Sequence, residues 1–167
     1  MKPVPRPKYG RGHGSLDGTM RSLAWRRIDE PGMEVAHVRS FTSAAGVQLG
    51  LTYDARWQLE GDELEVEVNA ERRDRFSLEG ADFFDVFASP FFNSLPVMRD
   101  GLLEAGPPRE YAMRFIMVPE LTAELSEQRY EPLGQRRVRY SSGSFESVIA
   151  FDEDGFVTIY DGFLERL

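Results

Sequence analysis

Side chains that could carry out acid–base or nucleophilic chemistry are few in this sequence. It has no cysteine and only two histidines, and His13 lies in the proline- and glycine-rich segment at the start of the chain. A Ser-His-Asp triad would therefore have to use His37. This residue sits in MEVAHVRS, a run typical of a strand, without a visible partner. A structural histidine is the simpler interpretation, since reactivity near neutral pH does not by itself make a site.

Carboxylates are the remaining candidates for chemistry. Asp82 and Asp85 flank two phenylalanines, and in a strand this odd spacing places them on opposite faces. A two-carboxylate mechanism needs both groups on one substrate, so solvated or turn-capping roles are the better interpretation. DEDG at 152–155 resembles part of a calcium loop but lacks the closing Glu, and GRGHG lacks the strand and helix that flank a phosphate loop. The sequence predicts no catalytic residue, no metal site and no cofactor.

The elements that would have to position a site are strands. ELEVEV at 63–68 alternates Glu with Leu or Val, which is typical of a half-buried antiparallel strand. EYAMRFIMVP at 110–119 is apolar on both faces, which favours a central strand. Turn signals separate such runs, and Asp154-Gly155 indicates a hairpin. PELTAELSEQ at 119–128 fits a short helix or a strand equally well.

This pattern predicts an all-β protein with a single domain and little helix. Sequential hairpins favour a large curved antiparallel sheet that forms a half-open or partly closed β-barrel, wide enough to hold a ligand. Residues 1–19 are predicted to form a flexible N-terminal tail, and residues 20–167 the β domain. The oligomeric state has no signature in the sequence.

Charge and hydropathy exclude several partners. The formal net charge is −8, which repels nucleic acids and anionic membranes. The N-terminal segment has no apolar core typical of a secretory signal. The uncharged run Val86–Met98 is too short to span a bilayer and contains two prolines. We therefore predict no nucleic-acid partner, no transmembrane segment and a cytoplasmic location.

The same uncharged run lies within DVFASPFFNSLPVMR at 85–99. Its prolines cannot join a central ladder, so part of it is predicted to be an edge, a bulge or a loop. Two interpretations stay open. The run is either core, as apolar residues usually are, or the wall of a ligand pocket, where Phe91 and Phe92 supply apolar surface and Asn93 a polar group.

Four blocks of the chain, in order, resemble the putative glycolipid-binding family. They are WRRIDEPGMEVAHVR at 25–39, DVFASPFFNSLPVMR at 85–99, VPELTAELSEQRYEPLG at 118–134 and RVRYSSGSFESVIAFDEDGFVTIYDGF at 137–163. The resemblance implies a strongly curved antiparallel half-barrel similar to bacterial lipoprotein carriers, and a glycolipid ligand. The chain departs from the family's pattern at Phe92, at Met98 and between Asn69 and Gly80, which bears on one wall of any pocket.

Three functions follow as hypotheses. The first is non-enzymatic binding of an amphiphile, such as a glycolipid, in the hollow of the sheet. The second is a small-molecule enzyme that uses His37 or a pocket carboxylate, and the third is a protein-interaction module with an exposed Phe-rich loop. Aromatic, amide and cationic side chains are the candidates for ligand contact: Trp25, Trp57, Phe91, Phe92, Asn93, Arg99 and Tyr130.

Overall fold

The structure, a computed structural model, describes residues 23–29, 34–35, 43–49 and 52–167. These residues form one 13-stranded sheet and one helix, α1 (Phe91–Asp100). The strands are β1 (Trp25–Arg27), β2 (Glu34–Val35), β3 (Ser43–Leu49), β4 (Asp54–Glu60), β5 (Glu63–Val68), β6 (Arg72–Ser77), β7 (Phe83–Val86), β8 (Arg109–Met117), β9 (Thr122–Gly134), β10 (Arg137–Ser142), β11 (Phe145–Phe151), β12 (Val157–Tyr160) and β13 (Leu164–Arg166). The predicted tail and His37 lie outside the described residues.

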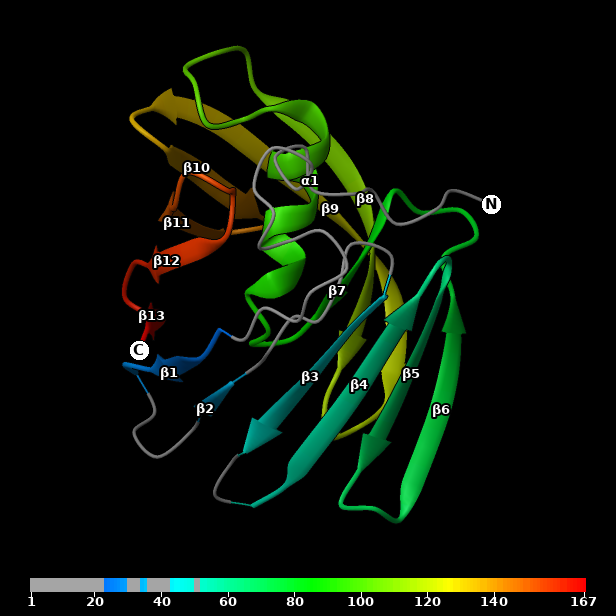
Figure 1. The fold of residues 1–167 in the computed structure, drawn as a ribbon. Coiled ribbons are helices and arrows are strands. Elements are labelled where there is room, and N and C mark those ends of the chain that lie inside the picture. Colours follow the sequence, from blue (N-terminus) through cyan, green and yellow to red (C-terminus); the bar gives the residue numbers. More distant parts are fainter. Residues whose placement is uncertain (1–22, 30–33, 36–42, 50–51) are drawn as a thin grey trace.

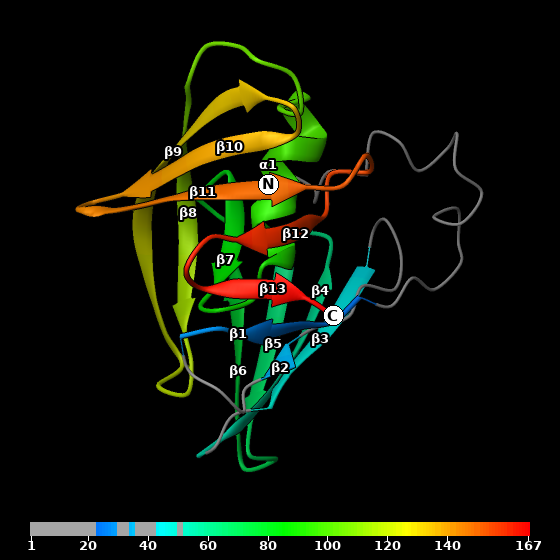
Figure 2. The ribbon, with the colours of Figure 1, turned by 90° about the vertical axis from the view of Figure 1, so that its left-hand side faces the viewer.

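The sheet curls into a half-barrel, as predicted. Its order is β6-β5-β4-β3-β2-β1-β13-β12-β11-β10-β9-β8-β7, and every neighbouring pair is antiparallel except β7 with β8. The edge strands β6 and β7 follow each other in sequence, so a short connection brings the two edges toward each other (Figure 1). Figure 2 shows β10 to β13 and β1 lying side by side across the wall. Arg72 donates a hydrogen bond of 2.6 Å to the Pro119 carbonyl and links β6 to the turn after β8.

Period-two alternation accounts for the strands. Leu64, Val66 and Val68 of β5 are buried, and the Glu residues between them face arginines of β6. Arg73 pairs with Glu67 at 2.6 Å and Arg75 with Glu65 at 3.1 Å, which are exposed pairs of small energy each. β8 lies between β7 and β9, as its two apolar faces predict. The ambiguous run after Pro119 is strand from Thr122 onward.

Segment 85–99 contains the predicted edge and loop, in strand β7 and residues 87–90, but also a helix that the sequence did not predict. It completes β7 and then forms α1, whose residues 91–98 are all buried. The helix is enclosed by the curved sheet (Figure 1). A helix that is covered on all sides has no polar face, so its sequence lacks the 3.6-residue amphipathic pattern. Gly101 ends it in the left-handed conformation, with φ of 67° and its N–H bonded to the Val97 carbonyl.

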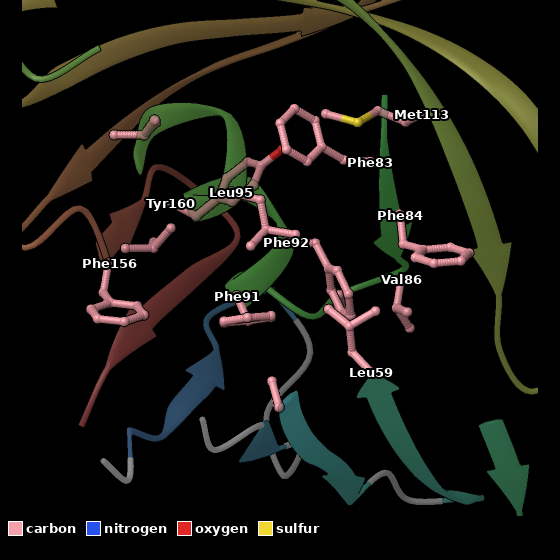
Figure 3. Close-up of a cluster of buried hydrophobic side chains, with 14 of the residues drawn as sticks. Leu59, Phe83, Phe84, Val86, Phe91, Phe92, Leu95, Met113, Phe156 and Tyr160 are labelled. Carbon is pink, nitrogen blue, oxygen red and sulfur yellow. The ribbon is translucent and has the colours of Figure 1, made fainter. Parts of the chain in front are cut away.

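An aromatic cluster joins the helix to the sheet. The ring centroid of Trp57 lies 5.4 Å from that of Phe91 and 4.8 Å from that of Phe92. Figure 3 shows both phenylalanines among the buried apolar side chains. Gly46 pairs with Trp57 across β3 and β4, and a Cβ at this glycine would lie 2.3 Å from the indole. The strand pair therefore needs glycine there for the indole to lie flat against it.

The hairpin between β11 and β12 is confirmed and abuts the helix. Gly155 has φ of +91°, and a Cβ there would lie 3.1 Å from Cγ of Met98. We expect Gly155→Val to lower the free energy of unfolding by about 1–3 kcal/mol, from backbone strain and from this contact. Gly143→Val is the matched control, because Gly143 has φ of +58° but nothing within 4 Å. Urea denaturation compares them, and an equal loss in both would mean that the helix contact has no cost.

Candidate ligand pocket

A pocket of about 450 Å³ lies between the first turn of α1 and the wall formed by β8 to β13. Its volume is in the range of small-molecule sites. The connection from β7 to α1, residues 87–90, forms one side, and β1 contributes Arg27 at the rim. The aromatic lining residues are Phe87, Phe115, Tyr140, Phe145, Tyr160 and Phe163.

These rings contact one another mainly edge to face. Tyr160 lies 5.9 Å from Tyr140 and 5.1 Å from Phe163, measured between ring centroids. Phe163 lies 6.3 Å from Phe87 on the opposite side. Phe145 contacts Tyr140 at 6.1 Å and is 49% exposed. Because the rings pack against one another, they form a preformed apolar wall. Phe145 lies at the solvent-exposed edge of this wall.

The rim carries a matched charge pair. The Arg27 guanidinium lies 4.8 Å from the centre of the Phe163 ring and 5.6 Å from that of Phe87. Its Nη2 is 2.8 Å from Oδ2 of Asp29. Asp29 also lines the pocket, so it balances the charge of Arg27 within the rim itself.

The most unusual polar group in the wall is Asp85. Its side chain is only 7% exposed, and its Oδ2 accepts a 2.7 Å hydrogen bond from Nε2 of Gln128. Burial raises the pKa of Asp85 to about 7, and the Gln128 bond offsets only part of this effect. No ion pair within the described residues involves Asp85. The expected solvated or turn-capping role is therefore wrong for this residue, because β7 is buried along its whole length.

Asn93 brings a second polar group from the helix. It is 5% exposed, lines the pocket, and donates from Nδ2 to the Tyr130 hydroxyl over 3.1 Å. Burial raises the pKa of Tyr130 well above its ordinary value, so this hydroxyl stays neutral. On the same wall, the hydroxyls of Ser126 and Ser142 lie 3.3 Å apart. Amide and hydroxyl groups thus accompany the aromatic rings.

Gln48 of β3 positions the 87–90 connection. Its Nε2 donates to the carbonyl of Phe87 and, over 2.7 Å, to Oγ of Ser89. The Tyr53 hydroxyl donates to the amide oxygen over 3.1 Å. Gln48 is fully buried and was missed in the sequence. The available signal was a polar side chain on the apolar face of an alternating strand.

The seven residues that the sequence analysis proposed for ligand contact lie in different parts of the structure. Asn93 lines the pocket, and Tyr130 lies directly behind it, 5.4 Å from the ring of Tyr140. Trp57, Phe91 and Phe92 form the core cluster and are absent from the pocket wall.

The two remaining candidates lie elsewhere. Trp25 is fully buried and donates from Nε1 to the Val157 carbonyl over 2.8 Å. Arg99 lies near the other end of α1, bonded to Asp100 at 3.1 Å and 4.5 Å above the centre of the Phe83 ring. Ligand contact by either is therefore not supported by position.

Other site types have no support in the part of the chain that the structure describes. There, no group of three His, Cys, Asp or Glu side chains could hold a metal ion. In the same residues, no helix combines the length and apolar character that a bilayer span requires.

The fold and pocket define the class as a half-barrel β protein with an aromatic, ligand-sized pocket beside a buried helix. Comparison with known families then identifies the family within this class. The family described as "Putative glycolipid-binding" matches residues 36–166, and the chain belongs to it. The resemblance seen in the sequence is thereby confirmed.

A solved structure supports the fold. The chain is similar to a DUF1089 family protein from Pseudomonas aeruginosa, with a TM-score of 0.61 and 23% identity over 89% of this chain and 95% of that chain. No curated protein matches the chain.

Proposed function

We propose that the protein binds an amphiphilic molecule non-enzymatically, with the headgroup in the pocket beside α1. The observation that carries the proposal is the pairing of aromatic rings with a few polar groups, Asp85, Asn93 and Gln128, in one pocket. Such a combination suits a ligand with both apolar and polar parts. Membership in the glycolipid-binding family favours a glycolipid as that ligand. The cytoplasmic location stays a prediction from the sequence.

The hollow of the half-barrel differs from an empty lipid channel. The buried helix lies in this hollow, and the pocket of about 450 Å³ beside it is the space that we assign to the ligand. We infer that the headgroup and the adjoining part of the apolar chain enter this space. The half-exposed ring of Phe145 then borders the chain where it leaves toward solvent.

An enzyme is the second candidate, and one observation favours it. The pKa of Asp85 is raised to about 7 by burial, which is suitable for acid–base work. Among the other titratable lining groups, Tyr140 and Tyr160 have pKa values raised further by burial, so they do not form a complementary acid–base pair with Asp85. The third hypothesis needed an exposed Phe-rich loop, whereas Phe91 and Phe92 are buried.

The test is calorimetric titration with amphiphiles that share an eight-carbon chain and differ in headgroup charge. We expect at least one to bind with one-to-one stoichiometry, and native mass spectrometry of the protein from its own host to reveal a co-purified amphiphile. Absence of binding by every amphiphile, together with ligand-free protein from the host, would contradict the proposal.

A substitution at Phe145, on the solvent-exposed edge of the pocket, tests where the ligand lies. Phe145→Ala is expected to weaken amphiphile binding about three- to tenfold, from the loss of roughly 1 kcal/mol of ring contact. Ile159→Ala is the matched control, because Ile159 is 50% exposed, as Phe145 is 49% exposed, but does not line the pocket. Equal affinities in the two variants would place the ligand elsewhere.

A further inference from the structure

We propose that the ligand headgroup carries a positive charge, an ammonium group that pairs with Asp85 against the aromatic wall. The inference rests on the proposed function, because it names the headgroup of the amphiphile that the pocket binds. An amino sugar would combine this cation with the hydroxyl groups of a glycolipid.

Within the described part of the chain, the charges around the pocket are unbalanced. Its charged lining residues are Arg27, Asp29, Asp85 and Glu124. Arg27 is balanced by Asp29 at 2.8 Å, and no ion pair in the described part of the chain involves Asp85 or Glu124. A pocket with two uncompensated acidic side chains repels an anionic headgroup. A buried carboxylate without a cation is costly, so a bound ammonium group would supply the missing charge.

Among the residues that the structure describes, the groups packed around Asp85 offer no internal substitute for that cation. Gln128 of β9 is neutral and donates to it. On β10 and β12, burial raises the pKa of Tyr140 and Tyr160, so both stay neutral hydroxyls. From α1 the facing residue is the neutral Asn93, and from β9 Glu124 adds negative charge.

The aromatic rings add a second attraction for cations. Ring faces attract ammonium and guanidinium groups, most strongly where water is excluded. Arg27 already lies 4.8 Å above the Phe163 ring at the rim, which demonstrates the geometry within this pocket. A ligand cation between this rim and Asp85 would contact aromatic rings and a carboxylate together. A neutral sugar would gain hydrogen bonds but neither electrostatic contribution.

The experiment compares octylammonium, octyl glucoside and octyl sulfate by calorimetric titration at pH 6 and pH 8. We expect wild-type protein at pH 8 to bind octylammonium at least tenfold more tightly than octyl glucoside, and octyl sulfate least. Alkylammonium ions keep their charge across this range, whereas Asp85 ionises around pH 7. Octylammonium affinity should therefore rise roughly tenfold from pH 6 to pH 8, and octyl glucoside affinity should change little.

Two variants distinguish a specific contact between the ammonium group and Asp85 from general attraction of cations to the acidic protein. Asp85→Asn keeps the shape and the Gln128 bond but should lose the preference for octylammonium and its pH dependence, with octyl glucoside binding retained. Asp161→Asn removes an exposed carboxylate and should behave as wild type.

The possible failures are distinguishable. If octyl glucoside binds at pH 8 as tightly as octylammonium, and Asp85→Asn leaves their ratio unchanged, the cationic headgroup is overturned and the proposed binding function stands. If none of the three amphiphiles binds at either pH, the cationic headgroup is overturned, and if the protein from its own host is also free of amphiphile, the proposed function itself fails. Asp85→Asn that keeps the full octylammonium preference would likewise overturn the role of Asp85.

Discussion

Replacing Asp85 with asparagine is expected to stabilise the protein at pH 8 by about 2–4 kcal/mol. The carboxyl has a pKa of about 7 in the folded protein, against an ordinary value of 3.8. The folded state therefore binds more protons than the unfolded state between these two pH values. The contribution of Asp85 to the free energy of unfolding is therefore largest below about pH 4. It falls as the pH rises and is smallest above about pH 7. Asparagine carries no charge, so it avoids that loss.

The pH dependence is the decisive part of this prediction. At pH 4, where the carboxyl is protonated in the folded state, Asp85→Asn should change stability by less than about 1 kcal/mol, since Gln128 can still donate to the new amide oxygen. At pH 8 the melting temperature should rise by roughly 5–12 °C. Asp161→Asn serves as the exposed control. An equal gain at both pH values, or none at pH 8, would mean that burial of the charge is not the cause. A carboxyl kept at this cost is typical of a functional site.

Truncating Phe92 is expected to cost about 3–5 kcal/mol, the range for a large buried aromatic residue. Its ring is 1% exposed and packs against Trp57 and Phe91 with centroid distances of 4.8 and 5.2 Å. Phe92→Ala thus removes one of the two ring contacts that join α1 to Trp57 of β4. Because the ring does not line the pocket, amphiphile affinity per folded molecule should change less than twofold.

Phe145→Ala should have the opposite effects, with little loss of stability but weaker amphiphile binding. We expect it to cost less than about 1 kcal/mol because its ring is half exposed, while it weakens amphiphile binding. Chemical denaturation and calorimetric titration of both variants test the contrast. A Phe92→Ala variant that stays nearly as stable as wild type but loses amphiphile binding would place its ring against ligand space, as the sequence had suggested.

Local patterns in the sequence determined the all-β class, several strands and their turns. ELEVEV at 63–68 has one apolar and one charged face, and it forms β5 with its Leu and Val residues buried. Asp154-Gly155 predicted a hairpin, and Gly155 has the positive φ that such a turn needs. These features depend on neighbours in the chain, because alternation and turn geometry act over a few residues. The sequential hairpins also favoured a half-open barrel, and the family resemblance agreed with it.

Only the tertiary structure decided that segment 91–100 is a helix and where the pocket lies. The helix is buried on every side, so the sheet around it, rather than a polar and an apolar face, determines its position. Asp85 and Gln128 are 43 residues apart, and Asn93 and Tyr130 are 37 apart. No local pattern relates such pairs, because strand order in the curled sheet brings them together. The polar wall of the pocket therefore exists only in the folded sheet.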